Sequence, residues 1–201
     1  MVISLTPLTT HFGAEMTGVD ITRPLSDTQF GKILAAFDEY SVLVLPNQPM
    51  TDDRQIDFSE RFGILEGTRA LNPGSGTPFA RQSNLDINTG ETIKADDRRI
   101  FYQKANMLWH SDSTFKLVPS LCSILSAREI PPVGGATEFV STRILYENLS
   151  DKEKCDFADL VIEHDFVYSR GIVGFSLSEE EALKFPSARH ALIRANTNNG
   201  R

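Results

Sequence analysis

Residues 106–115 read NMLWHSDSTF and place His110 and Asp112 one residue apart. In an extended strand, the side chains of residues i and i+2 point to the same face. An imidazole and a carboxylate would then project side by side, as two of the three ligands of the facial triad that holds a non-haem Fe(II). With four His and 14 Asp in 201 residues, such a pair arises by chance with a probability of about one in four. A surface hairpin without a metal is therefore the alternative.

The overall composition is that of one globular domain. The chain has 201 residues, of which 40% are hydrophobic and 23% are charged, and this length is enough for a sizeable core. A net charge of −7 argues against a nucleic-acid-binding face, which would be basic. The longest apolar runs are too short to cross a bilayer, so we expect no membrane partner.

The two cysteines, Cys122 and Cys155, lack the spacing of metal ligands. We interpret them as reduced, buried thiols of a cytoplasmic protein, with a disulfide as the alternative. The N-terminal residues lack the charged segment and long apolar core of a signal peptide.

Hydrophobic periodicity and capping residues predict short strands with helices between them. The pattern Ser26 to Gln29 is a capping box, and apolar residues then recur at helical spacing. We expect strands at 3–8, 41–45, 79–84, 121–130, 136–140, 161–168 and 190–196, and helices at 27–40 and after Thr51, Ser150 and Ser178. Many short strands with helices outside them favour a double-sheet barrel or jelly roll.

Residues 72–99 form a long segment with little periodicity, which is typical of a lid or a binding loop. A carboxylate substrate would need a cation there, ideally an arginine that binds it in a bidentate manner. The candidates in or beside this segment are Arg69, Arg81, Lys94, Arg98, Arg99 and Lys104. The sequence does not favour any one of them.

Several stretches together resemble a known family: LWHSDSTF at 108–115, LSA at 125–127, PPVGGATEF at 131–139, GAEMTGVD at 13–20, SVLVLPNQ at 41–48 and FSERFG at 58–63. They are similar, in the same order, to the Fe(II)/2-oxoglutarate-dependent dioxygenases of the taurine and 2,4-dichlorophenoxyacetate group. The sequence around His110 and around Thr137 looks closer to the phenoxyacetate branch than to the taurine branch.

The resemblance implies a fold and a set of site residues. The fold would be mostly β with flanking helices: a double-stranded β-helix (jelly-roll) barrel, within one taurine-dioxygenase-like domain over residues 1–201. His110 and Asp112 would bind Fe(II), and Thr137 would bind the distal carboxylate of 2-oxoglutarate. Asn106 would line the site near the co-substrate or the substrate. An ordinary strand threonine and an ordinary loop asparagine are the alternatives for these last two.

The family's third iron ligand, a histidine, and its 2-oxoglutarate-binding arginine would match positions beyond Arg201. We therefore expect a barrel that is incomplete at the C-terminus, and a reading frame that continues. Of the other histidines, His11 matches nothing in the family, His190 matches a segment away from the metal, and His164 reads as a surface or packing residue. We expect Trp109 to pack in the core.

The implied activity is hydroxylation of a phenoxyacetate-type acid with O2 and 2-oxoglutarate, which gives a phenol and glyoxylate with succinate and CO2. The partners would be this small carboxylate and O2, and the protein could form a homo-oligomer. A taurine or alkylsulfonate dioxygenase of the same family is one alternative. A catalytically dead jelly-roll binding protein is another.

Overall fold

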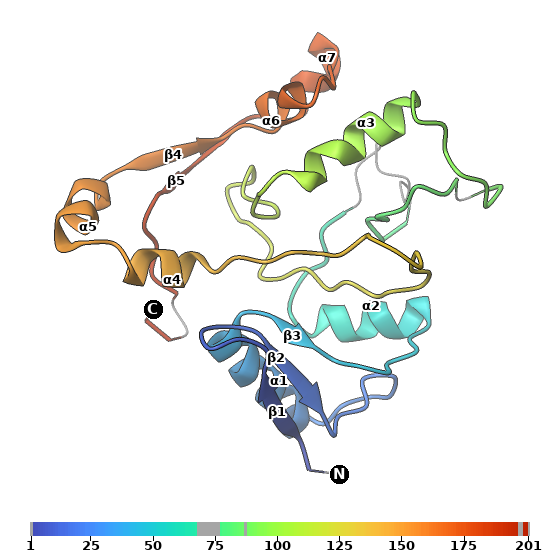
Figure 1. The fold of residues 1–201 in the computed structure, drawn as a ribbon, viewed down its shortest axis with the longest axis vertical. Helices are drawn as coiled ribbons and strands as arrows, with labels where there is room; N and C mark the ends of the chain where they lie inside the picture. The colour runs from blue at the N-terminus through green and yellow to red at the C-terminus, as the bar shows by residue number, and fades with distance from the viewer. Residues whose placement is uncertain (1, 68–76, 87, 197–198, 201) are drawn as a thin grey trace. The chain divides into compact units, whose positions relative to one another are not determined.

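The structure is a computed structural model that describes residues 2–67, 77–86, 88–196 and 199–200. The chain divides into two compact units, shown together in Figure 1. The first unit contains Met1–Arg61, Ile124–Leu160 and Ile193–Arg201, and the second contains Phe62–Ser123 and Val161–Leu192. That the chain forms a single domain stays a prediction.

The first unit is built on a three-stranded sheet. Strand β1 (Ser4–Pro7) pairs antiparallel with β2 (Ala14–Thr17), and β2 pairs parallel with β3 (Leu43–Val44). Gly18 ends β2 with a φ of 76°, and a Cβ atom there would lie 2.0 Å from the carbonyl oxygen of Val2. Only glycine fits at this position, because a side chain would clash with the backbone of the segment that leads into β1.

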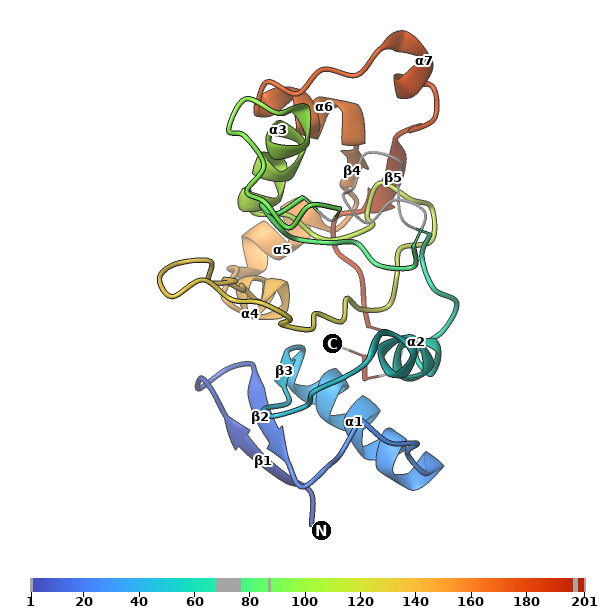
Figure 2. The same cartoon turned by 90° about the vertical axis from the view of Figure 1, so that its right-hand side faces the viewer.

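Helix α1 (Asp27–Tyr40) covers the sheet, as Figure 2 shows. Its buried side chains are Phe30, Ile33 and Ala36, which follow the helical period that the sequence indicates. They belong to the same unit as Met16 of β2, which is fully buried. The predicted helix at 27–40 is confirmed.

The N-terminus of α1 is held by the predicted capping box. The Ser26 hydroxyl accepts a hydrogen bond from the Gln29 amide at 3.3 Å, and the Gln29 side chain accepts one from the Ser26 amide at 3.0 Å. We expect Ser26→Ala to lower the free energy of unfolding by about 1 kcal/mol. Urea unfolding measures this change. Thr28→Ala, on an exposed site of the same turn, is the control and should change stability little.

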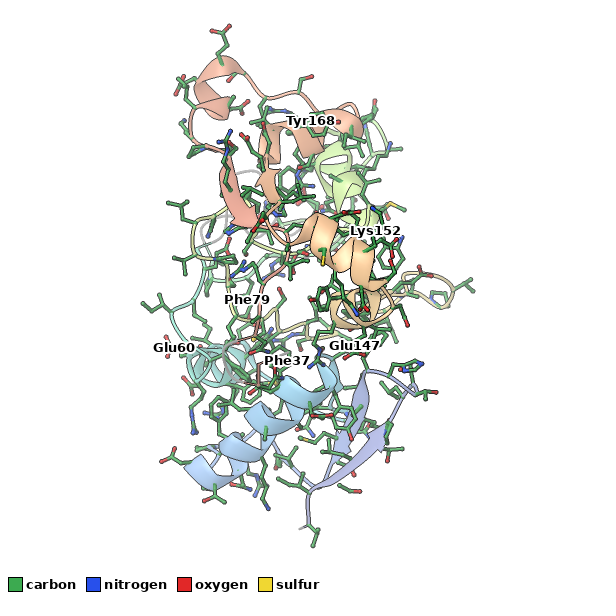
Figure 3. All side chains as sticks on the ribbon, turned by 90° about the vertical axis from the view of Figure 1, so that its left-hand side faces the viewer. Phe37, Glu60, Phe79, Glu147, Lys152 and Tyr168 are labelled. Atoms are coloured by element: carbon green, nitrogen blue, oxygen red, sulfur yellow. The ribbon has the colours of Figure 1, made fainter. Side chains whose placement is uncertain are left out.

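The C-terminus of α1 is held by a side chain from a later segment. Arg143, on α4 (Thr142–Glu147), donates hydrogen bonds to the carbonyl oxygens of Asp38 at 2.8 Å and Glu39 at 2.7 Å. The positive charge of Arg143 at this end also interacts favourably with the negative pole of the helix dipole. Figure 3 shows α4, labelled at Glu147, next to this end of α1.

Helix α2 (Asp52–Glu60) begins at its predicted cap, Thr51. Its buried Gln55 accepts a hydrogen bond from Arg128 at 2.8 Å and donates one to the carbonyl oxygen of Ile124 at 3.3 Å. Residues 124–128 are therefore tied to α2 by side chains. Helix α5 (Asp151–Phe157) follows α4 and begins at the predicted capping box of Ser150.

The second unit combines helices with a two-stranded sheet. Strand β4 (Val161–His164) pairs antiparallel with β5 (Ala188–Ala191). The helices are α3 (Arg98–Lys104), the 3-10 helix Ala105–Met107, α6 (Phe166–Ile172) and α7 (Glu179–Ala182). Helix α7 begins at the predicted capping box of Ser178, whereas α3 and α6 were not predicted.

An aromatic core holds the second unit together. Tyr102 of α3 and Phe166 of α6 are buried with Phe175, and the rings of Tyr102 and Phe175 meet edge-on at 5.6 Å between centroids. Phe115 packs against Phe166 at 5.3 Å. This contact joins the segment that follows Asp112 to α6.

The strand predictions are the main corrections. Residues 121–130, 136–140 and 79–84 form no strand, although Leu85 makes an isolated bridge with Thr92. A strand needs a neighbour for its backbone hydrogen bonds, and these segments have no ladder partner among the described residues. Apolar side chains there are exposed, with Ile130 at 75% and Val133 at 87%.

A mostly β fold with a jelly-roll barrel stays a prediction, because the described residues contain seven α-helices and five short strands. No closed barrel forms among them. The strand predicted as buried at 41–45 shortens to Leu43–Val44, and Val44 is exposed.

The two cysteines are free, Cys122 half-buried and Cys155 exposed, so the disulfide alternative does not hold. Within the described ranges, no helix is both long and apolar enough to cross a membrane.

Candidate metal centre

His110 and Asp112 lie in the second unit, just after the 3-10 helix Ala105–Met107. The structure brings the pair together: Nε2 of His110 is 3.3 Å from Oδ1 of Asp112. The means differ from the prediction, because residues 112–115 form a turn and not a strand. Ser113 adopts a φ of 60° at this turn, a left-handed conformation that is uncommon outside glycine.

The ring of His110 is oriented by its own backbone. Its Nδ1 atom lies 2.6 Å from the carbonyl oxygen of Leu108. A carbonyl only accepts, so Nδ1 carries the proton that it donates, and Nε2 faces Asp112. This is the arrangement that fixes a metal-binding histidine in proteins.

Asp112 is oriented in a similar way by Ser123, whose hydroxyl donates a hydrogen bond to Oδ2 at 2.5 Å. Oδ1 is left to face His110. The hydrogen bond between the two side chains raises the pKa of His110 and lowers the pKa of Asp112. Both side chains are about half exposed, at 43% and 59%, so an ion can reach them.

A partly buried carboxylate, that of Glu66, anchors the turn. Glu66 accepts hydrogen bonds from the hydroxyls of Ser113 and Ser120, and its Oε1 pairs with the Lys116 ammonium at 2.7 Å. Burial opposes ionisation of Glu66, but the hydrogen bonds from Lys116 and the two serines lower its pKa below 4.5. From the other side, Nε2 of His190 contacts the carbonyl oxygen of Thr114 at 2.9 Å.

We expect Glu66→Gln to cost about 1 kcal/mol of unfolding free energy at pH 7, because it removes a partly buried ion pair. The lowered pKa means that the charge of Glu66 contributes stability above pH 4.5, and that this is lost as pH falls through the folded-state pKa. Urea unfolding across this pH range should therefore show that the free energy of unfolding falls less steeply with decreasing pH in the variant than in the wild type. Glu91→Gln, at an exposed site, is the control; an equal acid loss in wild type and Glu66→Gln would contradict the assignment.

Asn106 lies near the pair and is held by two side chains. Its Nδ2 donates to Gln82 at 2.9 Å, and its Oδ1 accepts from Nη1 of Arg170 at 3.1 Å. Thr137 belongs to the first unit, where it is exposed and lies outside any strand. The roles of Asn106 and Thr137 stay predictions.

Of the candidate cations, two are neutralised by carboxylates. Arg98 pairs with Glu181 at 2.9 Å, and Arg99 pairs with Asp86 and Asp97. The hydrogen bonds from Arg99 lower the pKa of Asp97 to about 2. Arg81, Lys94 and Lys104 are exposed. Arg69 lies outside the described residues.

The other predicted roles are partly corrected. His190 packs against His164 at 5.5 Å between ring centroids and holds the turn, so it is structural. His11 is exposed near β1. Trp109 is 67% exposed, which corrects its expected place in the core. No sequence pattern predicts Glu66, Ser123 or Arg170 at the site, because a long or irregular stretch of chain separates each of them from His110 and Asp112.

The residues present fit part of a metal site. An imidazole nitrogen and a carboxylate oxygen converge, each oriented by a second hydrogen bond, and they suit iron or manganese. Across the ranges that the structure describes, no group of three or more His, Cys, Asp or Glu side chains forms. His110 and Asp112 could supply two of the three ligands of a facial triad, and this role stays a prediction.

Comparison with known proteins decides the family. The sequence model described as "Taurine catabolism dioxygenase TauD, TfdA family" matches residues 4–201. The chain belongs to this family. The resemblance seen in the sequence is confirmed, and with it a 2-oxoglutarate-dependent dioxygenase that uses a metal.

Two relatives and one solved structure extend this assignment. The alpha-ketoglutarate-dependent 2,4-dichlorophenoxyacetate dioxygenase of Cupriavidus pinatubonensis (strain JMP 134 / LMG 1197) is 33% identical over 206 residues, which cover 100% of this chain and 72% of the relative. The (S)-phenoxypropionate/alpha-ketoglutarate-dioxygenase of Sphingobium herbicidovorans is 34% identical over 171 residues, which cover 85% of this chain and 56% of the relative.

The crystal structure of AAD-2 in complex with Mn(II) and N-oxalylglycine matches this chain with a TM-score of 0.89 and 36% sequence identity. The match covers 100% of this chain and 70% of AAD-2. In that protein, Mn(II) stands in for Fe(II), and N-oxalylglycine is an analogue of 2-oxoglutarate. This chain therefore spans 56% to 72% of the lengths of these three proteins.

Proposed function

We propose that this TauD/TfdA-family chain carries the Fe(II)- and 2-oxoglutarate-binding part of a dioxygenase that hydroxylates a phenoxyacetate-type acid, such as 2,4-dichlorophenoxyacetate. The observation that carries the proposal is the convergence of Nε2 of His110 and Oδ1 of Asp112 at 3.3 Å. The relatives that act on phenoxyacetate and phenoxypropionate support the substrate class. The jelly-roll barrel remains part of this proposal.

The reaction balances without a strong acid or base from the protein. One atom of O2 is inserted into a C–H bond beside the ether oxygen, and the other enters succinate as 2-oxoglutarate loses CO2. The hydroxylated product is a hemiacetal, which breaks at the ether carbon to give a phenol and glyoxylate. Bound Fe(II) supplies the oxygen chemistry, and the chain supplies ligation and orientation.

Each of the chain's own residues has one task in this proposal. His110 and Asp112 hold the metal, and Leu108 and Ser123 keep their donor atoms in place through the two hydrogen bonds described above. Thr137 binds the far carboxylate of 2-oxoglutarate. We also infer a cytoplasmic enzyme, which the free thiols of Cys122 and Cys155 support.

Succinate release tests the proposal. The full-length product of the gene is supplied with Fe(II), ascorbate and 2-oxoglutarate, and succinate is measured with 2,4-dichlorophenoxyacetate, with taurine or with neither. We expect succinate, phenol and glyoxylate in equal amounts with the phenoxy acid. Succinate released with taurine alone would favour a sulfonate dioxygenase, and no metal binding would favour a catalytically dead binding protein.

A further inference from the structure

Arg170, on α6, carries a charge that no acidic side chain among the described residues balances. Its Nη1 donates hydrogen bonds to the carbonyl oxygen of Tyr102 at 2.9 Å and to Oδ1 of Asn106 at 3.1 Å. Its Nε is buried without a hydrogen-bond acceptor. Across the described part of the chain, no carboxylate forms an ion pair with Arg170, and Nη2 makes no hydrogen bond.

A half-buried guanidinium without a counter-ion is uncommon, because proteins usually pair such a charge. Burial lowers the pKa of Arg170, although the group stays protonated. By contrast, Arg98 and Arg99 of the same unit are each paired with at least one carboxylate. Arg170 can therefore bind an anion that is not part of the described residues.

The position of Arg170 connects this capacity to the metal pair. Arg170 lies on α6, which contacts the 3-10 helix Ala105–Met107, and this helix ends three residues before His110. Through Asn106, Arg170 is bonded to the segment that leads directly into His110. An anion on Arg170 would therefore lie beside the candidate metal centre.

Aromatic side chains surround the guanidinium. Its central carbon lies 4.5 Å from the ring centroid of Tyr102 and 4.8 Å from that of Phe166. Phe166 also contacts Phe115, which follows Asp112 in the turn. These contacts lie against the guanidinium and orient it. Among the described residues, Nη2 is then its one donor nitrogen that is neither hydrogen-bonded nor buried.

We propose that Arg170 binds the carboxylate of the acid that is hydroxylated, and so selects aromatic acids over neutral or amine-bearing substrates. The inference rests on the proposed function, because it takes the substrate to be a phenoxyacetate-type acid. Nη2 donates a charge-assisted hydrogen bond to the substrate carboxylate, and Asn106 holds the guanidinium through Nη1. The co-substrate carboxylate is the competing ligand of the same chemistry.

Direct binding separates these ligands without turnover. The full-length product of the gene is loaded with Mn(II), and calorimetry measures the binding of 2,4-dichlorophenoxyacetate, its neutral amide and N-oxalylglycine. Arg170→Gln and Arg170→Lys are compared with Arg98→Gln, which removes a cation of the same unit that Glu181 neutralises. Thermal unfolding of each variant checks that it is folded.

We expect Arg170→Gln to weaken binding of the acid at least about ten-fold, with no change for the amide or for N-oxalylglycine. Arg170→Lys should restore part of the affinity, because it keeps the charge and loses the planar fork. Arg98→Gln should bind all three ligands as the wild type does.

Three results would overturn the assignment: unchanged binding of the acid by Arg170→Gln, equal losses for the acid and the amide, or a loss confined to N-oxalylglycine. Unchanged binding would show that Arg170 does not bind the acid, and equal losses would show that it acts only on the structure. A loss confined to N-oxalylglycine would show that it binds the co-substrate. If the wild type releases succinate with taurine and not with the phenoxy acid, the proposed function fails independently of Arg170.

Discussion

Replacing either His110 or Asp112 by alanine is expected to abolish succinate formation. The same variants should lose Mn(II) affinity by more than roughly 100-fold, because losing even an outer partner of a metal ligand typically costs 10- to 100-fold. Each donor atom is oriented by its own hydrogen bond, to Leu108 or from Ser123. Among the described residues, no third His, Cys, Asp or Glu gathers with the pair to take the place of a lost ligand. Succinate release and electron paramagnetic resonance of bound Mn(II) measure the two effects.

Matched controls separate ligand loss from general damage. His11→Ala and Asp159→Ala remove the same side-chain types at exposed positions and should retain activity. Thermal unfolding should show His110→Ala and Asp112→Ala to be folded, because both side chains are about half exposed. Full activity in either variant would remove that residue from the metal site.

Thr137→Val should weaken the apparent affinity for 2-oxoglutarate by about ten- to a hundred-fold. Valine is nearly isosteric and keeps the branched shape, so the backbone should tolerate it. The change deletes one charge-assisted hydrogen bond to the far carboxylate, which is worth roughly 1.5–3 kcal/mol. The Thr137 side chain is exposed, and its hydroxyl has no hydrogen bond among the described residues, so it is available for this role.

Titration of 2-oxoglutarate against succinate formation measures this effect. Thr137→Ser keeps the hydroxyl and is the matched control, with an expected half-saturation close to that of the wild type. The half-saturation for the phenoxy acid should change little in both variants. If the half-saturation for 2-oxoglutarate stays the same in a folded Thr137→Val protein, Thr137 has no part in the co-substrate site.

Helix starts could be predicted from the sequence because capping is local. The boxes at Ser26, Ser150 and Ser178 each require residues three apart, and each begins a helix in the structure. Helices α3 and α6 were missed although Asp97 and Asp165 cap them with single hydrogen bonds. A lone Asp cap is common in loops too, so it predicts less than a reciprocal box.

Strands were predicted less well because each needs a partner elsewhere in the chain. The segments 161–164 and 188–191 find each other across more than twenty residues and pair. Residues 121–130 and 136–140 have similar β-branched and apolar content but no ladder partner within the described ranges. Propensity alone therefore does not decide whether such a segment becomes a strand.

In the candidate site too, the local feature was predicted from the sequence and the long-range contacts were not. The pairing of His110 with Asp112 was predicted from their spacing, although a turn and not a strand brings them together. Glu66 and Arg170 come from distant segments, and their contacts depend on the packing of the whole second unit. The sequence contains no local signal that separates Arg170 from the other arginines.

The left-handed backbone conformation of Ser113 limits which residue types can occupy position 113, next to Asp112, during evolution. Glycine would adopt the φ of 60° easily but would lose the hydroxyl that bonds Glu66. Aspartate could adopt it as well, but would set a second negative charge against Glu66. Valine and isoleucine resist this conformation, and would drive the backbone towards a form that separates the two candidate ligands. Only a small side chain with a donor, such as serine or asparagine, satisfies both demands, so variation at this one position should be far narrower than its polar chemistry suggests.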